Sequence, residues 1–199
     1  MSDSGNPVVL VHGLTDTGTK MRYISDRLRA TGRKTYSIDL QPGSGEAPLE
    51  LLAKQLEGFI NRHLGKATTL DLVGFSMGGL VTRYYMQRLG GIDRVEHYVT
   101  LSAPHRGTIA AYFTGRPGCV QMRPNSEFLR DLQSDVTMLA KVKFTSIWTA
   151  WDTIILPAHS SCLPVGKDVQ IPVLAHPLMV IDYRSLDAIA HGLGIDPQH

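Results

Sequence analysis

The pentapeptide Gly74-Phe75-Ser76-Met77-Gly78 constrains the fold more than any other part of this chain. Residues 68–73 before it favour a short buried strand, and residues 79–89 after it have the pattern of a helix. A serine in the spacing G-x-S-x-G between a strand and a helix stands on a sharp turn that needs glycine on both sides. Ser76 is therefore a candidate nucleophile, supported by Gly74 and Gly78. The alternative is a chance match in an ordinary loop.

Length and composition fit one soluble-type domain and exclude several classes of protein. The chain has 199 residues, of which 43% are hydrophobic, so one domain over 1–199 with a real core is expected. A formal charge of +2 with no run of Lys or Arg does not indicate nucleic-acid binding. No apolar run reaches the ~18–20 residues of a transmembrane helix. The first residues lack the basic and apolar regions of a secretory signal, so we expect a cytoplasmic protein.

The sequence has two cysteines and no pattern of residues typical of a metal site. Cys119 and Cys162 can form one disulfide at most, and two reduced thiols fit a cytoplasmic protein better. Neither has the spacing of a zinc ligand. We therefore expect no cofactor and no metal.

Strand and helix patterns alternate along the whole chain. Strands are expected at 7–11, 34–38, 68–73, 94–102, 143–150 and 169–175, and helices at 17–31, 48–63, 79–89 and 178–192. Such alternation predicts an α/β fold with a minimal six-stranded, mostly parallel sheet and helices on both faces. Ligands bind beyond the carboxyl ends of the strands in these sheets. The polar residues expected at that edge are His12, Ser76, His105, Asp152 and His176.

A serine nucleophile needs a base, and the base needs a carboxylate to orient it, in the chain order serine, acid, histidine. Asp152 follows the strand-like segment 144–151 and is the preferred acid, although a turn or helix-cap aspartate is the alternative. Four other acids are less well placed, because two lie in a helical or loop stretch, one precedes a strand and one lies in the last helix: Asp131, Asp135, Asp168 and Asp182.

The preferred base is His176, which follows the last expected strand and comes one strand after Asp152. His105 precedes the acid and so breaks the order. His159 is only seven residues beyond Asp152, which leaves no room for a strand between them.

Acyl transfer also needs N–H donors for the negative oxygen of the intermediate. The residue after the nucleophile supplies one, which is Met77 here, and the loop after the first strand supplies the other. In the loop His12-Gly13-Leu14 the candidate donor is Leu14, with His12 and Gly13 in support. The alternative for His12-Gly13 is a plain turn.

Three segments together resemble the α/β-hydrolase fold, and more narrowly the small bacterial triacylglycerol lipases and esterases. They are Val11-His12-Gly13-Leu14, Gly74–Gly79 and Leu101–Thr108, the last similar to the Pro-His-x-Gly-Thr stretch of bacterial lipases. The resemblance covers most of the chain and implies a serine hydrolase of carboxylic esters of lipids or acylglycerols, with a transient contact to a lipid interface. An acyltransferase or thioesterase would use the same triad, and a non-catalytic binding protein of this fold is the remaining alternative.

The segment 105–140 is the only sizeable insertion, between the fourth and fifth strands. Its apolar side chains could line a groove for an acyl chain, or they could belong to helices that pack on the core. The residues concerned are Ile109, Tyr112, Phe113, Val120, Met122, Phe128, Leu129 and Leu132.

Overall fold

The computed structural model describes residues 5–195, and its centre is one six-stranded sheet. Every neighbouring pair of strands is parallel, in the order β2-β1-β3-β4-β5-β6. The expected α/β fold is confirmed, and among the described residues the sheet has no antiparallel pair. The strands are β1 (Val8–Val11), β2 (Thr35–Ile38), β3 (Leu70–Phe75), β4 (Val95–Leu101), β5 (Lys143–Trp148) and β6 (Lys167–Gln170).

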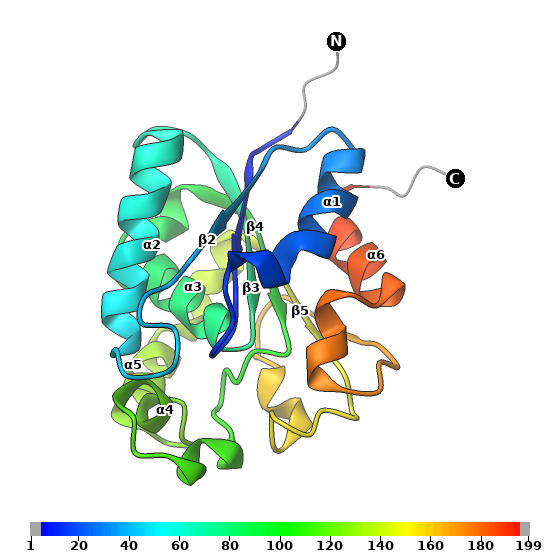
Figure 1. Ribbon diagram of the computed structural model, residues 1–199. Coiled ribbons are helices and arrows are strands. Elements are labelled where there is room, and N and C mark those ends of the chain that lie inside the picture. Colours follow the sequence, from blue (N-terminus) through cyan, green and yellow to red (C-terminus); the bar gives the residue numbers. More distant parts are fainter. Residues whose placement is uncertain (1–4, 196–199) are drawn as a thin grey trace.

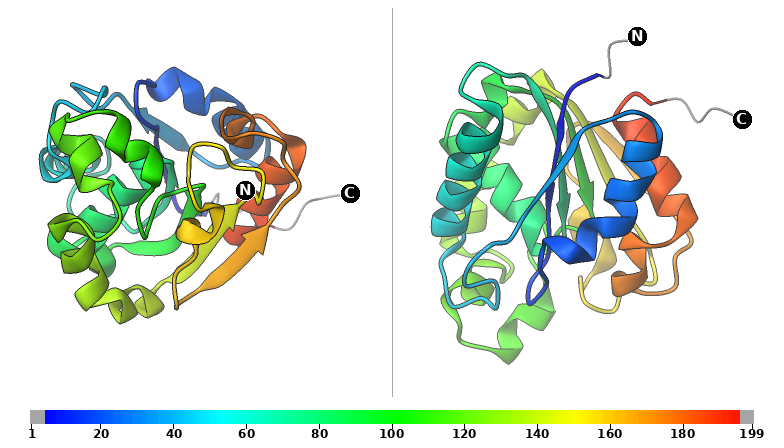
Figure 2. Two further views of the ribbon diagram at one scale, coloured as in Figure 1. Left: turned by 90° about the horizontal axis from the view of Figure 1, so that it is seen from below. Right: turned by 45° about the horizontal axis from the view of Figure 1, so that its top comes forward.

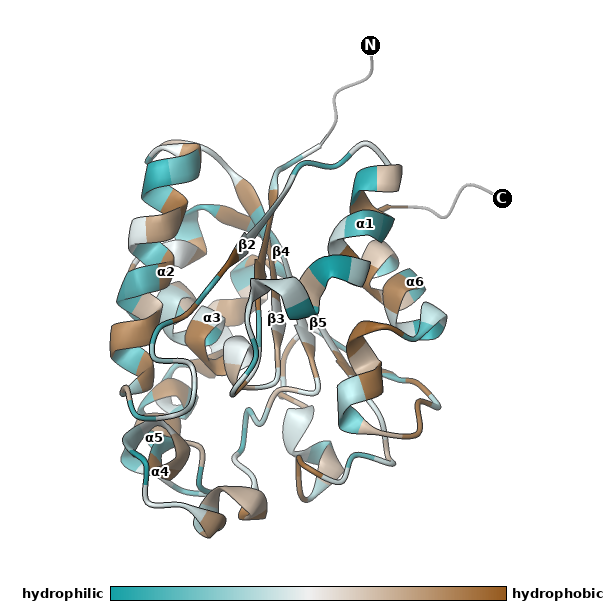
Figure 3. Cartoon of the chain, in the orientation of Figure 1, coloured by the Kyte–Doolittle hydropathy of each residue, from teal (hydrophilic) through white to brown (hydrophobic). Residues whose placement is uncertain are grey.

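Helices cover both faces of the sheet, as Figure 1 shows. α2 (Leu49–Leu64) and α3 (Met77–Arg88) pack on one face, and α1 (Arg22–Ala30) and α6 (Tyr183–Gly192) pack on the other. Each face buries its own apolar core, which explains why β1 and β3 are buried along their whole length. In Figure 3 the apolar residues concentrate along these strands and on the inner sides of the helices.

The strand order places the candidate nucleophile at the point where the chain changes direction across the sheet. From β1 the chain moves to β2 on one side, and it then returns to β3 on the other side of β1. Val11, the last residue of β1, lies opposite Gly74 in β3. The loop after β1 and the turn at Ser76 therefore emerge side by side at the carboxyl edge, where α/β sheets bind ligands.

Three expected boundaries near the carboxyl edge were wrong. The last strand is 167–170 rather than 169–175, because Pro172 has no N–H to continue the ladder. Consequently Asp168 lies within a strand, and His176 begins the 3₁₀ segment η6 (His176–Val180) instead of ending a strand. β5 stops at Trp148, two residues early.

The helices differ from expectation at two places. The expected helix 178–192 is divided into η6 and α6, and Asp182 caps α6 by accepting a hydrogen bond from the Arg184 N–H. The expected helix 17–31 begins with the 3₁₀ segment η1 (Gly18–Met21) before α1.

The insertion between β4 and β5 consists of short helices at the carboxyl edge. They are η3 (Ile109–Phe113), α4 (Pro117–Gln121), α5 (Glu127–Ser134) and η4 (Val136–Lys141). Its apolar side chains divide into two groups. Met122, Phe128, Leu129 and Leu132 are buried in the core, whereas Ile109, Tyr112, Phe113 and Val120 are exposed.

The remaining segments are short. In the described part of the chain, no helix is long and apolar enough to cross a membrane. η2 (Gly91–Asp93) leads into β4, and η5 (Ala158–Ser161) leads from β5 towards β6. Cys119 and Cys162 are both free thiols.

Candidate active site

Ser76 stands between β3 and α3 in a strained backbone conformation. Its φ of 52° and ψ of −124° lie in a region that side chains with a Cβ rarely adopt. The turn is held by two backbone hydrogen bonds, from the Ser76 N–H to the Leu101 carbonyl at 2.8 Å and from the Gly79 N–H to the Ser76 carbonyl at 2.9 Å. The strain is therefore fixed by β4 on one side and by the helix on the other.

Gly74 and Gly78 allow the chain to pass through this turn. A Cβ on Gly78 would lie 2.4 Å from the Val11 carbonyl oxygen and 2.5 Å from that of His12. A Cβ on Gly74 would lie 2.7 Å from the Cα of Gly79 and 2.7 Å from Thr82 Oγ1. Real Cβ atoms do not approach backbone so closely, so the first turn of α3 can pack against β1 only when these positions are glycine.

Asp152 and His176 form a hydrogen-bonded pair. His176 Nδ1 donates to Asp152 Oδ2 at 2.8 Å, and both side chains are almost completely buried. The other carboxylate oxygen, Oδ1, accepts from the backbone N–H groups of Ile154 at 2.9 Å and Ile155 at 2.8 Å. The carboxylate is thus fixed at both oxygens, and with Nδ1 protonated the His176 Nε2 is left with a free lone pair.

The surroundings keep Asp152 ionised. Burial acts to raise the pKa of this carboxyl, but the hydrogen bond from His176, the charge of that ring and the two backbone N–H groups outweigh it. The pKa of Asp152 therefore lies below its ordinary value. An ionised carboxylate in this position stabilises a positive charge on His176.

The His176 ring reaches the neighbourhood of Ser76 through Phe75. The Phe75 and His176 rings are 4.9 Å apart between centroids, and Phe75 directly precedes Ser76. Within residues 5–195 the structure contains no hydrogen bond from Ser76 Oγ to His176. In enzymes without substrate this contact is often long, and it shortens when substrate binds.

The loop after β1 lies against the Ser76 turn and is held by His12. The His12 ring is fully buried; its Nδ1 donates to the Gly13 carbonyl at 2.8 Å, and its Nε2 accepts from the Leu40 N–H at 2.9 Å. His12 is therefore a structural clamp. The N–H groups of Leu14 and Met77 have no hydrogen-bond acceptor in the described part of the chain, as expected of oxyanion donors.

A buried arginine, Arg83 of α3, was missed by sequence reasoning and anchors the insertion. Its guanidinium donates to the His105 carbonyl at 3.1 Å, at the start of the insertion, and to the Leu132 carbonyl at 2.6 Å, within α5. Burial lowers the pKa of Arg83 to about 10, so it stays charged. Arg83 is the one charged residue in the stretch 79–87, and this isolation was the available sign of its role.

Thr108 connects the insertion to the acid loop. Its Oγ1 donates to the Ile154 carbonyl at 2.6 Å and accepts from the Leu156 N–H at 2.9 Å. Ile154 is also one of the residues whose N–H binds Asp152. The Pro-His-x-Gly-Thr stretch therefore helps to position the loop that holds the carboxylate.

His105 and His159, the other histidines considered as base, lie in unsuitable surroundings. His105 is 1% exposed, and its Nε2 pairs with Thr100 Oγ1 at 3.0 Å. Burial and the nearby charge of Arg83 hold the pKa of His105 well below its ordinary range. His159 is exposed on η5. Among residues 5–195 no three His, Cys, Asp or Glu side chains gather closely enough to hold a metal ion.

The neutral His105 predicts a loss of stability in acid. Below about pH 6.5 an unfolded chain binds a proton at this residue and the folded chain does not. As the pH is lowered below about 6.5, the free energy of unfolding should therefore decrease, and this residue should contribute up to ~1.4 kcal/mol per pH unit to the decrease. Urea unfolding between pH 7.5 and 5 should show a smaller slope for His105→Gln than for the wild type. The exposed His159→Gln is the control, and equal slopes in all three proteins would contradict the assignment.

Large exposed apolar side chains stand on segments at the carboxyl edge of the sheet. The left view of Figure 2 shows the ribbon of this edge from below. They come from three segments: η3, the loop after β5, and the residues around η6. We call this set the apolar rim; its members are Ile109, Tyr112, Phe113, Trp151, Ile154, Leu156, Leu174, Leu178 and Ile181. Phe113 is 92% exposed, which excludes a core role for it. The rim faces solvent at the same edge of the sheet as the Ser76 turn.

The parallel sheet, the strained serine turn and the Asp152–His176 pair define the class of α/β hydrolases. Among solved structures, Bacillus licheniformis lipase BlEst2 in its mature form matches with a TM-score of 0.78 over 96% of this chain and 93% of that chain, at 15% identity. Aspergillus fumigatus lipase B matches with a TM-score of 0.81 over 96% of this chain and 53% of that chain, at 18% identity. These likenesses show the fold.

The sequence comparisons show the family. The family model described as palmitoyl protein thioesterase matches residues 7–159, and the chain belongs to this family of α/β hydrolases. A triacylglycerol lipase of Pseudarthrobacter phenanthrenivorans is 26% identical over 164 residues, which are 78% of this chain and 46% of the lipase. The lysosomal thioesterase PPT2 of Mus musculus is 31% identical over 108 residues, which are 52% of this chain and 35% of that protein. The chain spans less than half the length of these relatives.

Proposed function

We propose that this protein hydrolyses carboxylic esters of lipids or acylglycerols through an acyl-enzyme on Ser76. The observation that carries the proposal is the strained Ser76 turn beside the buried Asp152–His176 pair. The lipase and thioesterase relatives support an acyl substrate. The chemistry needs no cofactor.

In the proposed mechanism Ser76 Oγ attacks the ester carbonyl while His176 Nε2 removes its proton. Asp152 keeps the proton on Nδ1 and stabilises the imidazolium that forms. The N–H groups of Met77 and Leu14 bind the negative oxygen of the tetrahedral intermediate; each such donor typically contributes ~2.7–4 kcal/mol. His176 then protonates the leaving alcohol, and a water molecule activated by the same nitrogen releases the acid.

Hydrolysis of acyl thioesters is the second candidate. It is favoured by the match to the palmitoyl protein thioesterase model over most of the chain. The same triad serves both reactions, because only the leaving atom changes from oxygen to sulfur. Transfer of the acyl group to an alcohol is a further outcome of the same intermediate.

The apolar rim supports a lipid substrate and a transient contact with a lipid interface. The exposed part of the insertion, Ile109, Tyr112 and Phe113, contributes one side of it. Phe128 does not, since it is buried and stacks on Tyr84 at 5.6 Å between ring centroids. If the insertion selects the acyl chain, η3 is the part that does so.

Labelling with a fluorophosphonate and a series of acyl substrates test the proposal. We expect the label on the peptide that contains Ser76, and hydrolysis of p-nitrophenyl esters between acetate and palmitate. Palmitoyl thioesters measured beside them rank the two candidate reactions, and added alcohol reveals acyl transfer. A protein that takes no label and cleaves none of these substrates is a binding module, and the proposal is then wrong.

A further inference from the structure

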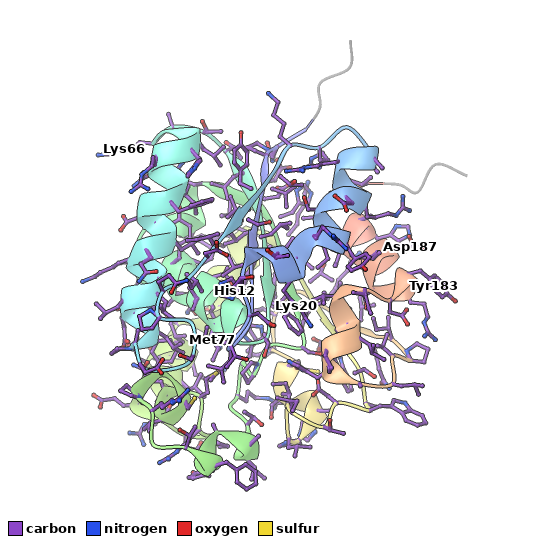
Figure 4. The ribbon with its side chains drawn as sticks, in the orientation of Figure 1. His12, Lys20, Lys66, Met77, Tyr183 and Asp187 are labelled. Carbon is purple, nitrogen blue, oxygen red and sulfur yellow. The ribbon has the colours of Figure 1, made fainter. Side chains whose placement is uncertain are left out.

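A cleft of about 470 Å³ opens beside the loop that carries Leu14. Its walls are the loop residues Thr15–Thr17, η1 with the start of α1, and Ile181 directly after η6. Lys20, which Figure 4 labels, belongs to these walls. The cleft therefore lies between the loop of the proposed oxyanion donor and the segment that begins with His176. Neither the triad nor the oxyanion donors account for it.

Asp16 connects this cleft to the nucleophile. A Cβ on Gly13 would lie 3.1 Å from Ser76 Cβ and 3.2 Å from Asp16 Oδ2. The carboxylate and the serine therefore face the same small space across Gly13. Asp16 also lines the cleft and is partly exposed, so a molecule in the cleft can reach it.

The Asp16 carboxylate has no hydrogen-bond donor of its own within residues 5–195. A carboxylate close to the site of a developing negative charge opposes that charge, so its place there is unfavourable unless a ligand binds to it. Other residues that line the cleft carry groups that donate or accept hydrogen bonds, namely Thr17, Thr19 and Lys20. The Thr15 hydroxyl already donates to the Leu14 carbonyl at 2.7 Å, so it can serve a ligand only as an acceptor. A ligand with several hydroxyls satisfies both kinds of group at once.

We propose that this cleft, with Asp16 as its specificity-determining residue, binds a polyol leaving group such as the glycerol of a monoacylglycerol. The inference rests on the proposed ester hydrolysis at Ser76 and names the alcohol side of the substrate. Asp16 accepts hydrogen bonds from the free hydroxyls, while Lys20 and the threonines complete their coordination. The ester oxygen then leaves towards His176, which gives it a proton.

The arrangement of the edge explains why the cleft receives the alcohol and not the acyl chain. The apolar side chains of the rim stand mainly on η3 and on the loop after β5, which suit a hydrocarbon chain. The cleft is lined by Asp16, Lys20, Arg22 and three threonines, together with Tyr23 and Ile181. The rim and the cleft meet at Ile181. In the proposed complex the hydrocarbon chain lies along η3 and the loop after β5, and the hydroxyls of the glycerol lie at Asp16.

The test compares two laurate esters that differ only in the alcohol, 1-monolauroylglycerol and ethyl laurate, below the concentrations at which they form aggregates. In the wild type, kcat/KM should be higher for the glycerol ester. In Asp16→Asn the ratio of the two kcat/KM values should fall about tenfold or more, the usual cost of losing a hydrogen bond to a charged group. Asp26→Asn, an exposed acid on α1 outside the cleft, makes the same change of charge and should keep the wild-type ratio.

The possible outcomes separate this inference from the proposed function. If the wild type cleaves both esters and takes the fluorophosphonate label, an unchanged ratio in Asp16→Asn overturns the cleft assignment and leaves the hydrolase intact. An equal fall in Asp26→Asn also overturns it, because the effect would then be one of overall charge. If the wild type takes no label and cleaves neither ester, both proposals are wrong.

Discussion

Replacing Ser76 by alanine is expected to lower kcat/KM for p-nitrophenyl esters by about 10³-fold or more and to abolish fluorophosphonate labelling. Loss of the nucleophile in other serine hydrolases removes almost all catalysis beyond what binding and the oxyanion donors supply. The substitution keeps the Cβ and removes only the hydroxyl, which makes no hydrogen bond in the described structure. The folded state should therefore be retained, which circular dichroism and thermal unfolding can check.

Ser102 provides a matched control for this experiment. It also follows a strand of the sheet, has a positive φ of 41°, and is fully buried with an unpartnered hydroxyl. Ser102→Ala should keep the label and the activity, because nothing in the proposed mechanism uses this hydroxyl. If Ser76→Ala were as active as the wild type, the observed hydrolysis would not come from Ser76.

The second large effect is expected from Gly78→Ala, which should lower the free energy of unfolding by at least about 3 kcal/mol. The new methyl group would meet the carbonyl oxygens of Val11 and His12 at 2.4 and 2.5 Å. These are backbone atoms of a buried strand and its loop, and they cannot rotate away as a side chain does. Any relief must shift the loop that carries Leu14, so remaining folded protein should also lose activity. Urea unfolding with a parallel esterase assay measures both effects.

Gly58→Ala makes the same substitution on an exposed position of α2 where no atom lies within 4 Å of the new Cβ. Alanine is the better helix former, so this variant should be more stable by ~0.5–1 kcal/mol. A destabilisation of similar size in both variants would show that the effect at position 78 is not a collision with β1.

The sequence predicted the order and type of the central elements because hydrophobic periodicity and glycine spacing determine them locally. The turn at Ser76 is the clearest example, since β3 ends at Phe75 and α3 begins at Met77. The secondary structure of the segment before His176 was harder to predict. Ile171 and Val173 are buried like strand residues, but Pro172 between them removes the N–H that pairing requires. An apolar run indicates burial, and burial does not by itself require a strand.

Contacts between distant segments could not be predicted from local patterns. The pairing of Asp152 with His176 followed from chain order, which carries three-dimensional information only when the fold is known. Arg83 and Asp16 had no such order to identify them. Arg83 obtains its place from a partner far along the chain, the Leu132 carbonyl that it binds. Asp16 is placed by the loop after β1, which brings its carboxylate close to Gly13 and so to Ser76.

The contacts of Thr108 have a consequence for efforts to alter the acyl preference of this protein. The hydroxyl of Thr108 links the insertion to the backbone of Ile154 and Leu156. In the same loop the N–H groups of Ile154 and Ile155 hold the carboxylate of Asp152. The insertion therefore cannot be exchanged without affecting the loop that holds Asp152. A segment grafted from another hydrolase would replace the contact that Thr108 makes with residues 154–156. Such a graft should therefore change the turnover together with the chain-length preference, unless Thr108 is retained.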